Sequence, residues 1–206
     1  MRYWPVVIVF LLSSCIDKQI PSQKFTAVWP GSFDTSNLNL VKNYRSKFLG
    51  NLNLSDISTG TDSFEIRFGY NHALFVEKDL FVIKYTNGDW KGVHFAYQHV
   101  ELNDSISFNK KEFDPMVSWK ELIDSIYTSN ILNIPSQIDL KGYKNRVNDG
   151  KYLMLEYATK NNFKLILYEN PDKYPEFPES QIVLDFIDIF YKSISAKERC
   201  WPRCQN

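Results

Sequence analysis

The chain has no excess of charge of either sign and few histidines and cysteines, and each shortage excludes a class of function. Its 206 residues include 24 basic and 24 acidic side chains, so the formal net charge is +0 at pH 7. Domains that bind nucleic acid carry a basic surface, so we predict no nucleic-acid partner. The three histidines and three cysteines form no H-E-x-x-H and no C-x-x-C motif, so we predict no metal site.

Motifs for nucleophilic catalysis and for phosphate binding are missing as well. The sequence contains no G-x-S-x-G elbow, no G-x-x-x-x-G-K loop and no G-x-G-x-x-G loop, so we assign no catalytic residue and no cofactor. Charged residues make up 23% and apolar residues 44% of the chain, which are ordinary values for a globular domain. The 16% aromatic content is high, but many of these residues fall at expected core positions.

The first residues have the composition of a targeting segment. Met1-Arg2 is a short positive region, the segment from Pro5 to Leu12 is apolar, and small residues precede Cys15. The apolar segment is much shorter than the roughly 20 residues of a membrane-spanning helix. Leu12-Ser13-Ser14-Cys15 resembles the lipobox of bacterial lipoproteins, and the resemblance covers about the first twenty residues. It implies cleavage before Cys15 by signal peptidase II and attachment of lipid to that cysteine.

This resemblance divides the chain into a signal peptide at 1–14, a tether at 15–24 and a single domain at 25–206. The attached acyl chains would anchor the protein in the membrane, since each buried methylene contributes about 0.8 kcal/mol to the free energy of membrane binding. In this family, an aspartate directly after the lipidated cysteine can retain the protein at the inner membrane. Here Ile16 follows Cys15 and Asp17 comes next, so the retention signal is not matched. We therefore expect the protein to be anchored in the outer membrane, on either its periplasmic or its outer face. A secretory signal with a chance cysteine and an uncleaved anchor are the alternatives.

Cys200 and Cys204 are the two cysteines that remain once Cys15 carries lipid. Three residues separate them, a spacing that can bring their Cα atoms within the roughly 4.4–6.8 Å that a disulfide requires. The cell envelope permits disulfides, so we predict a bond between them that fixes the C-terminal tail. A redox role is disfavoured because the redox motif is C-x-x-C, and a zinc site needs more ligands than these two.

The clearest strand signals lie between Ser63 and Tyr97. Phe64, Ile66, Phe68 and Tyr70 alternate with polar or small residues, the period of a half-buried strand. Further along, residues 80–85 and 90–97 flank Asn87-Gly88, a pair that tolerates the positive φ of a type I′ hairpin turn. A two-residue turn at this place predicts the cross-strand pairs Leu80–Phe95, Val82–Val93 and Tyr85–Trp90.

A second hairpin and three helices complete the predicted fold. Asn161-Asn162 is expected to join strands 152–159 and 163–168, with Tyr157 opposite Ile166 and Leu155 opposite Tyr168. Helices are expected at about 34–50, 118–130 and 179–197, the second one with a capping box of Ser118 and Glu121. Residues 101–114 are polar and no strand is predicted there. The predicted class is α+β, with a mainly antiparallel sheet built from hairpins and about three helices.

Three histidines and one glutamate remain as candidates for chemistry. His94 and His99 are five residues apart, so a continuous strand directs them to opposite faces, and His72 is expected in the turn after the first strand. Histidines that are exposed or satisfied by the fold are the better interpretation. Glu156 lies in mid-strand and faces either solvent or a partly covered face of the sheet.

The expected function is therefore non-catalytic binding of a protein or small ligand by a domain held on the membrane through its lipid anchor. A lipoprotein that confers immunity to a toxin is one alternative, since the size of the domain and its expected location in the cell envelope allow it. A hydrolase with a dispersed site, involving His94 or Glu156, is another. A deep hollow that gathers histidines and carboxylates would favour the hydrolase, whereas an exposed patch rich in aromatic residues would favour binding.

The lipobox resemblance gives the first testable prediction. Labelled palmitate should be incorporated into the wild-type protein and not into Cys15→Ser, because serine lacks the thiol that receives the lipid. Incorporation is measured on the immunoprecipitated protein after growth with the label. Label that persists in Cys15→Ser would contradict the lipoprotein interpretation.

Overall fold

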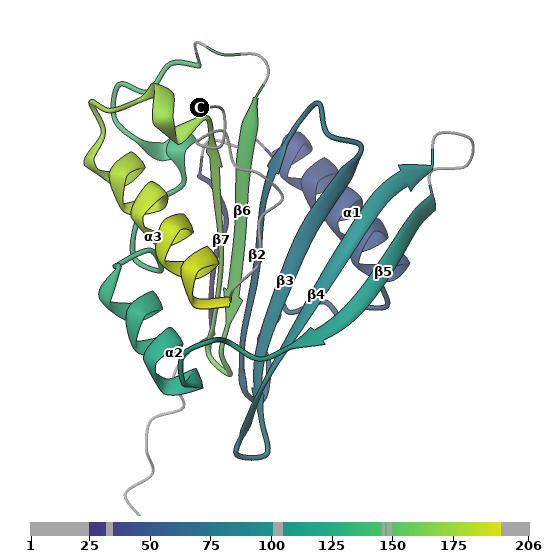
Figure 1. Cartoon of the computed structure of the whole chain (residues 1–206). Helices are drawn as coiled ribbons and strands as arrows, with labels where there is room; N and C mark the ends of the chain where they lie inside the picture. Colours follow the sequence, from purple (N-terminus) through teal and green to yellow (C-terminus); the bar gives the residue numbers. More distant parts are fainter. Residues whose placement is uncertain (1–24, 32–34, 101–104, 146, 148–149, 195–206) are drawn as a thin grey trace, which may run out of the picture.

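A mixed seven-stranded β-sheet runs through the computed structural model, which describes residues 25–31, 35–100, 105–145, 147 and 150–194 (Figure 1). The strand order is β1-β7-β6-β2-β3-β4-β5. The strands are β1 Thr26–Val28, β2 Phe64–His72, β3 Glu77–Thr86, β4 Asp89–Val100, β5 Ser105–Phe113, β6 Lys151–Ala158 and β7 Asn162–Glu169. The α-helices are α1 Thr35–Asn51, α2 Trp119–Thr128 and α3 Pro178–Ile194, and two short 3₁₀ turns are η1 Gln137–Asp139 and η2 Pro171–Lys173.

The α+β class is confirmed, and the sheet is mainly antiparallel. One part of the prediction needs correction, because the sheet is mixed and is not built from hairpins alone. Strand β1 pairs with β7 in parallel, with Thr26 opposite Asn162, and β2 pairs with β6, which is far away in the sequence. These two pairings bring the N-terminal and C-terminal halves of the described chain into one sheet.

The first hairpin forms as its turn residues predict. Asn87 and Gly88 have φ values of 55° and 92°, the positive values that a type I′ turn requires. The turn sets Leu80 opposite Phe95, Val82 opposite Val93 and Tyr85 opposite Trp90. All three predicted cross-strand pairs are therefore confirmed.

The register predicted for the second hairpin is wrong by two residues. Tyr157 lies opposite Lys164 and Leu155 lies opposite Ile166, so the turn residues are Lys160 and Asn161. The hydroxyl oxygen of Thr159 accepts hydrogen bonds from the backbone N–H groups of Asn161 and Asn162, at 3.3 and 3.1 Å. The Thr159 side chain therefore supports the turn beside the backbone bond from its own N–H to the Asn162 carbonyl at 2.8 Å, and neither asparagine has a positive φ.

Strands β1 and β5 form the two edges of the sheet, and neither was predicted. β1 has three residues and depends on β7 for its pairing. β5 is nine residues long but mostly exposed, and edge strands often carry charged residues that discourage pairing with other chains. Strand β5 carries three such charged residues in a row, Lys110, Lys111 and Glu112. They account for the polar composition of this segment.

Helices cover both faces of the sheet (Figure 1). On one face, α1 packs Phe48, Leu49 and Leu52 against buried residues of β3 and β4. On the other, α2 and α3 pack against the apolar residues of β2, β6 and β7. The predicted capping box at the start of α2 is confirmed, since Ser118 accepts from the backbone of Glu121 and the Glu121 side chain bonds the backbone of Ser118.

Because helices cover both faces of the sheet, strand β2 is buried on both of its faces. The alternation from Phe64 to Tyr70 predicted a half-buried strand, and Glu65 and Arg67 are among the polar residues that alternate with the apolar ones. Both side chains are instead buried, at 3% and 1% exposure. They lie under α1, so their charges need partners inside the protein.

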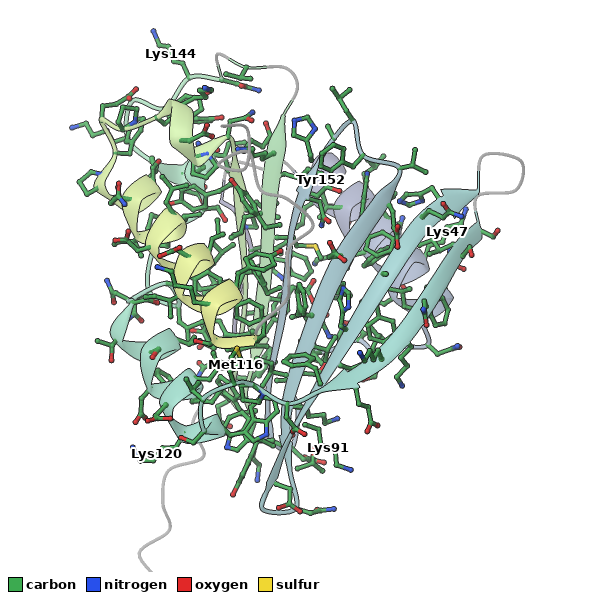
Figure 2. All side chains as sticks on the ribbon, viewed as in Figure 1. Lys47, Lys91, Met116, Lys120, Lys144 and Tyr152 are labelled. Atoms are coloured by element: carbon green, nitrogen blue, oxygen red, sulfur yellow. The ribbon has the colours of Figure 1, made fainter. Side chains whose placement is uncertain are left out.

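The two ends of the sheet differ. The β3–β4 turn, the β6–β7 turn and the first residue of β1 share one end, here called the hairpin end. The β2–β3 connection, residues 73–76, lies at the other, here called the loop end. Figure 2 shows Tyr152 near the loop end and Lys91 near the hairpin end. A nine-residue strand such as β2 spans about 25 Å between them.

Several sequence predictions fall outside the described residues. These are the signal peptide, the tether, Cys15 and the Cys200–Cys204 disulfide. Within the ranges that the structure describes, no helix is long and apolar enough to cross a membrane.

Gly88 and Gly50 provide a matched pair for testing the first hairpin. A Cβ atom at either position would meet no atom within 4 Å, and both residues are exposed. They differ in backbone conformation, since Gly88 has a φ of +92°. Gly88→Ala should lower the free energy of unfolding by about 1 kcal/mol, and Gly50→Ala, within helix α1, should raise it by up to about 1 kcal/mol. Urea denaturation measures both, and equal effects would contradict the role of the turn.

Candidate functional site

The three histidines lie apart in the structure. His94 and His99 are on opposite faces of β4, as their spacing predicts. The His94 ring stacks on Phe81 at a centroid distance of 4.5 Å, on the face of the sheet that α3 covers, whereas the His99 ring lies 6.1 Å from that of Tyr97 on the α1 face. His72 is the last residue of β2 and not a turn residue.

His94 has a carboxylate partner. Its Nε2 atom lies 2.7 Å from Oδ1 of Asp79, and both side chains are partly exposed. A carboxylate can orient a histidine for proton transfer, but the same contact also fixes the ring against Phe81. Among the residues described by the structure, no group of three or more His, Cys, Asp and Glu side chains could hold a metal ion.

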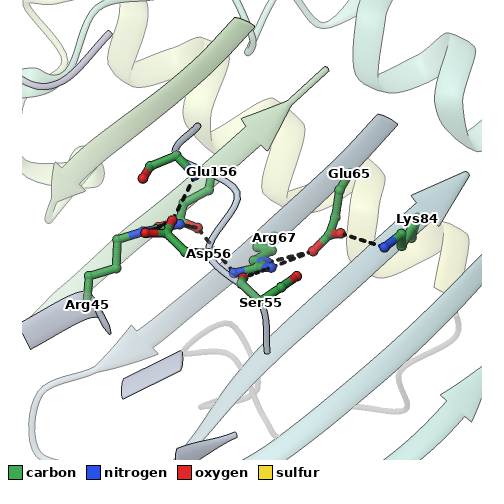
Figure 3. Close-up of polar contacts among 8 residues, drawn as sticks. Arg45, Ser55, Asp56, Glu65, Arg67, Lys84 and Glu156 are labelled. Carbon is green, nitrogen blue, oxygen red and sulfur yellow. Dashed lines mark hydrogen bonds and ion pairs between the residues drawn. The ribbon is translucent and has the colours of Figure 1, made fainter. Parts of the chain in front are cut away.

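Glu156 belongs to a buried charge cluster between α1 and the sheet (Figure 3). Both of its carboxylate oxygens accept hydrogen bonds from Arg45, one from Nε and the other from Nη2 at 3.0 Å. Arg67 Nη1 approaches the carboxylate at 3.8 Å. The sequence left Glu156 between solvent and a partly covered face. At 1% exposure it is fully covered.

Arg67 connects this pair to β2 and to the loop after α1. Its Nε donates to Oε1 of Glu65 at 2.8 Å, and its Nη2 donates to the carbonyl oxygen of Ser55 at 2.6 Å. Lys84 approaches the second oxygen of Glu65 at 3.5 Å from the more exposed side. The charge cluster is defined here as Arg45, Asp56, Glu65, Arg67, Lys84 and Glu156.

The pKa shifts in the cluster follow from these contacts. Burial lowers the pKa of Arg45, but hydrogen bonds and charge attraction from Glu156 and Asp56 outweigh it, so the pKa is raised. Burial raises the pKa of Asp56, but hydrogen bonds from Arg45 and Ser58 outweigh it, so the pKa is lowered. Both groups therefore stay charged at neutral pH, and three cations face three anions.

This arrangement suits structure better than acid–base chemistry. The carboxylates of Glu65 and Glu156 are taken up by arginine side chains, so neither is available to a substrate. His94 lies on the other face of the sheet. The two residues considered for a dispersed hydrolytic site are thus not brought together.

A separate hollow opens between α1 and the loop end of the sheet, and it is called here the α1 hollow. Its volume is about 190 Å³. The lining residues come from α1, β2, β3, β4 and β6. Its largest side chains are Tyr44, Phe48, Tyr97 and Tyr152.

The α1 hollow exists because strands β2 and β3 stop pairing regularly near Gly69. Their ladder runs from Phe64 to Phe68. Beyond it, the side chain of Asn71 replaces the ladder, since its Nδ2 donates to the Asp79 carbonyl at 3.0 Å and its Oδ1 accepts from the Asp79 N–H at 2.6 Å. A Cβ on Gly69 would lie 2.9 Å from that carbonyl oxygen. Glycine therefore permits the close approach and leaves the floor of the hollow open.

Apolar side chains extend from this region into solvent. Leu74, Phe75 and Val76 are 75%, 59% and 72% exposed, and their loop connects Asn71 to Lys78, which both line the hollow. Tyr44 is 62% exposed on α1. A contiguous group of exposed apolar residues beside a hollow is typical of a binding surface.

Sequence reasoning did not find the α1 hollow. Tyr44 and Phe48 are four residues apart and therefore lie on one face of α1, but only Phe48 is buried. One available signal was Gly69 within a strand, since such a glycine often marks a close backbone approach. Another was the run Ala73–Val76, which is apolar and has no strand period. No protein-family model matches the chain, and no curated protein is significantly similar to it.

The charge cluster gives a prediction for stability. Glu156→Gln should lower the free energy of unfolding by about 3 kcal/mol, because it leaves the buried charge of Arg45 without its main partner. Asp56 also binds Arg45, but its side chain is 51% exposed, so Asp56→Asn should cost less than about 1 kcal/mol. Urea denaturation of both variants tests this difference. Similar losses of unfolding free energy in Glu156→Gln and Asp56→Asn would show that burial of the carboxylate does not determine how much each ion pair with Arg45 stabilises the fold.

Proposed function

We propose that this protein is a lipid-anchored binding protein of the bacterial cell envelope, and that the α1 hollow is its binding site. The supporting observation is the hollow itself, where four aromatic side chains surround about 190 Å³ beside an exposed apolar loop. Lipid on Cys15 would hold the protein at the outer membrane, as the lipobox resemblance implies.

Binding is favoured over catalysis by the state of the acidic groups. Glu65 and Glu156 are neutralised by Arg67 and Arg45, and the carboxylate of Asp79 is bonded to His94. His99 and Asp79 also line the hollow, but the Asp79 carboxylate is directed to His94, and most of the lining side chains are aromatic or apolar, as in a binding site.

The position of the hollow fits an anchored protein. The described chain begins at Phe25, next to β1, whose first residue is at the hairpin end. The α1 hollow lies at the loop end, about 25 Å further along the strands. With the tether at 15–24 attached to the membrane, the hollow would face away from the lipid surface and stay open to a ligand.

Photocrosslinking in cells tests this proposal without knowledge of the ligand. A benzoylphenylalanine replaces Tyr44, which is 62% exposed at the hollow, or Tyr127, which is 55% exposed on α2. The variant at Tyr44 should form a covalent adduct with the occupant, because its ring borders the site. The adduct is detected by gel mobility and by the intact mass of the purified protein.

Tyr127 is the matched control, since it has a similar exposure on the opposite face of the sheet. It should form no adduct. Crosslinking at Tyr127 and not at Tyr44, or equal crosslinking at the two positions, would contradict the assignment of the α1 hollow as the binding site.

A further inference from the structure

The size of the α1 hollow limits what it can hold. Its volume is about 190 Å³, whereas sites for drug-sized ligands usually measure about 300–1,000 Å³. An apolar cavity of about 150 Å³ holds one benzene molecule. The α1 hollow therefore accommodates one six-membered ring with a small substituent.

The walls of the hollow favour an aromatic ring. Phe48 and Tyr97 meet edge to face, with centroids 5.1 Å apart, and the side chains of Tyr44 and Tyr152 also line the hollow. Leu80 adds further apolar surface. Aromatic rings stack on such surfaces in offset or edge-to-face arrangements.

Lys78 gives the hollow a positive charge. Its Nζ atom lies 5.5 Å from the centre of the Tyr152 ring, and it forms no ion pair with any carboxylate of the described residues. The neighbouring Asp79 directs its carboxylate to His94. By contrast, Lys84 on the same strand approaches Glu65. Lys78 is therefore a cation beside aromatic walls that lacks a counter-ion in the described chain.

We propose that the α1 hollow binds a small aromatic carboxylate, with its ring against Tyr44 and Tyr152 and its carboxylate beside the ammonium group of Lys78. This inference rests on the proposed binding function and adds the class of ligand. A neutral ring would fill the same space but would leave Lys78 unpaired. A charged ligand without a ring would leave the aromatic surfaces in contact with water.

Titration with two probes of similar shape tests the proposal. Benzoate carries the negative charge, and benzamide is its neutral counterpart. Binding to the full-length mature protein is followed by ligand-observed NMR. For benzoate, the expected dissociation constant is on the order of 1 mM, as befits so small a ligand. Benzamide should bind about fivefold more weakly, since a partly exposed ion pair supplies no more than that factor.

Lys78→Gln should weaken benzoate binding about fivefold and leave benzamide binding unchanged, so that the preference disappears. Lys91→Gln is the matched control, because Lys91 is an exposed lysine on β4 near the hairpin end (Figure 2). It should bind both probes as the wild type does. Circular dichroism and urea denaturation confirm that each variant is folded.

Equal affinity of the wild type for benzoate and benzamide would overturn the proposal, as would equal loss of benzoate binding in Lys78→Gln and Lys91→Gln. The absence of benzoate binding would also overturn it. If benzoate fails while Tyr44 still crosslinks to an occupant, the ligand class is wrong and the binding function stands. If Tyr44 captures nothing and benzoate does not bind, both are wrong.

Discussion

Mutual neutralisation of buried charges is the condition on which the layer between α1 and the sheet depends. Arg45 comes from α1, Glu156 from β6, and Glu65 and Arg67 from β2, and all four side chains are buried. An unpaired charge at such a depth costs several kcal/mol. Helix α1 therefore lies on the sheet in the one position that joins Arg45 to Glu156. The same contacts hold the loop after α1, through Asp56 and the carbonyl of Ser55.

The α1 hollow is a consequence of this arrangement. Arg45 fixes the middle of the helix over β6, and Phe48 packs against Tyr97 of β4. Tyr44, next to Arg45 in the chain, is then held over the part of the sheet where the β2–β3 ladder has ended. The rings that surround the hollow are thus positioned by contacts outside it. The hollow is thus preformed, and a preformed site reduces the entropy lost when a ligand is ordered.

Local chemistry determined what could be predicted from the sequence. Asn87-Gly88 specified a turn and a register, and Ser118 with Glu121 specified a helix start, because each signal acts over a few residues. The second hairpin was misread because Thr159 closes it through its side chain. The buried charges were missed because Glu65 and Arg67 alternate with apolar residues as solvent-facing residues do, and their burial depends on a helix that begins about thirty residues earlier. The α1 hollow depends on Gly69, Asn71 and α1 together, so no single segment encodes it.

The parallel pairing of β1 with β7 also has a mechanical consequence. A pull on the chain ahead of Phe25 reaches the sheet through β1, which is bound to β7 along three residue pairs. Because ladder hydrogen bonds run across the strands, a pull directed along β1 loads the bonds of this pair together in shear rather than opening them one at a time. Strand β7 passes the load to β6 and then to β2. Tension at the N-terminal side of the domain is thereby spread over the central strands before it reaches the region of Asn71 and Lys78.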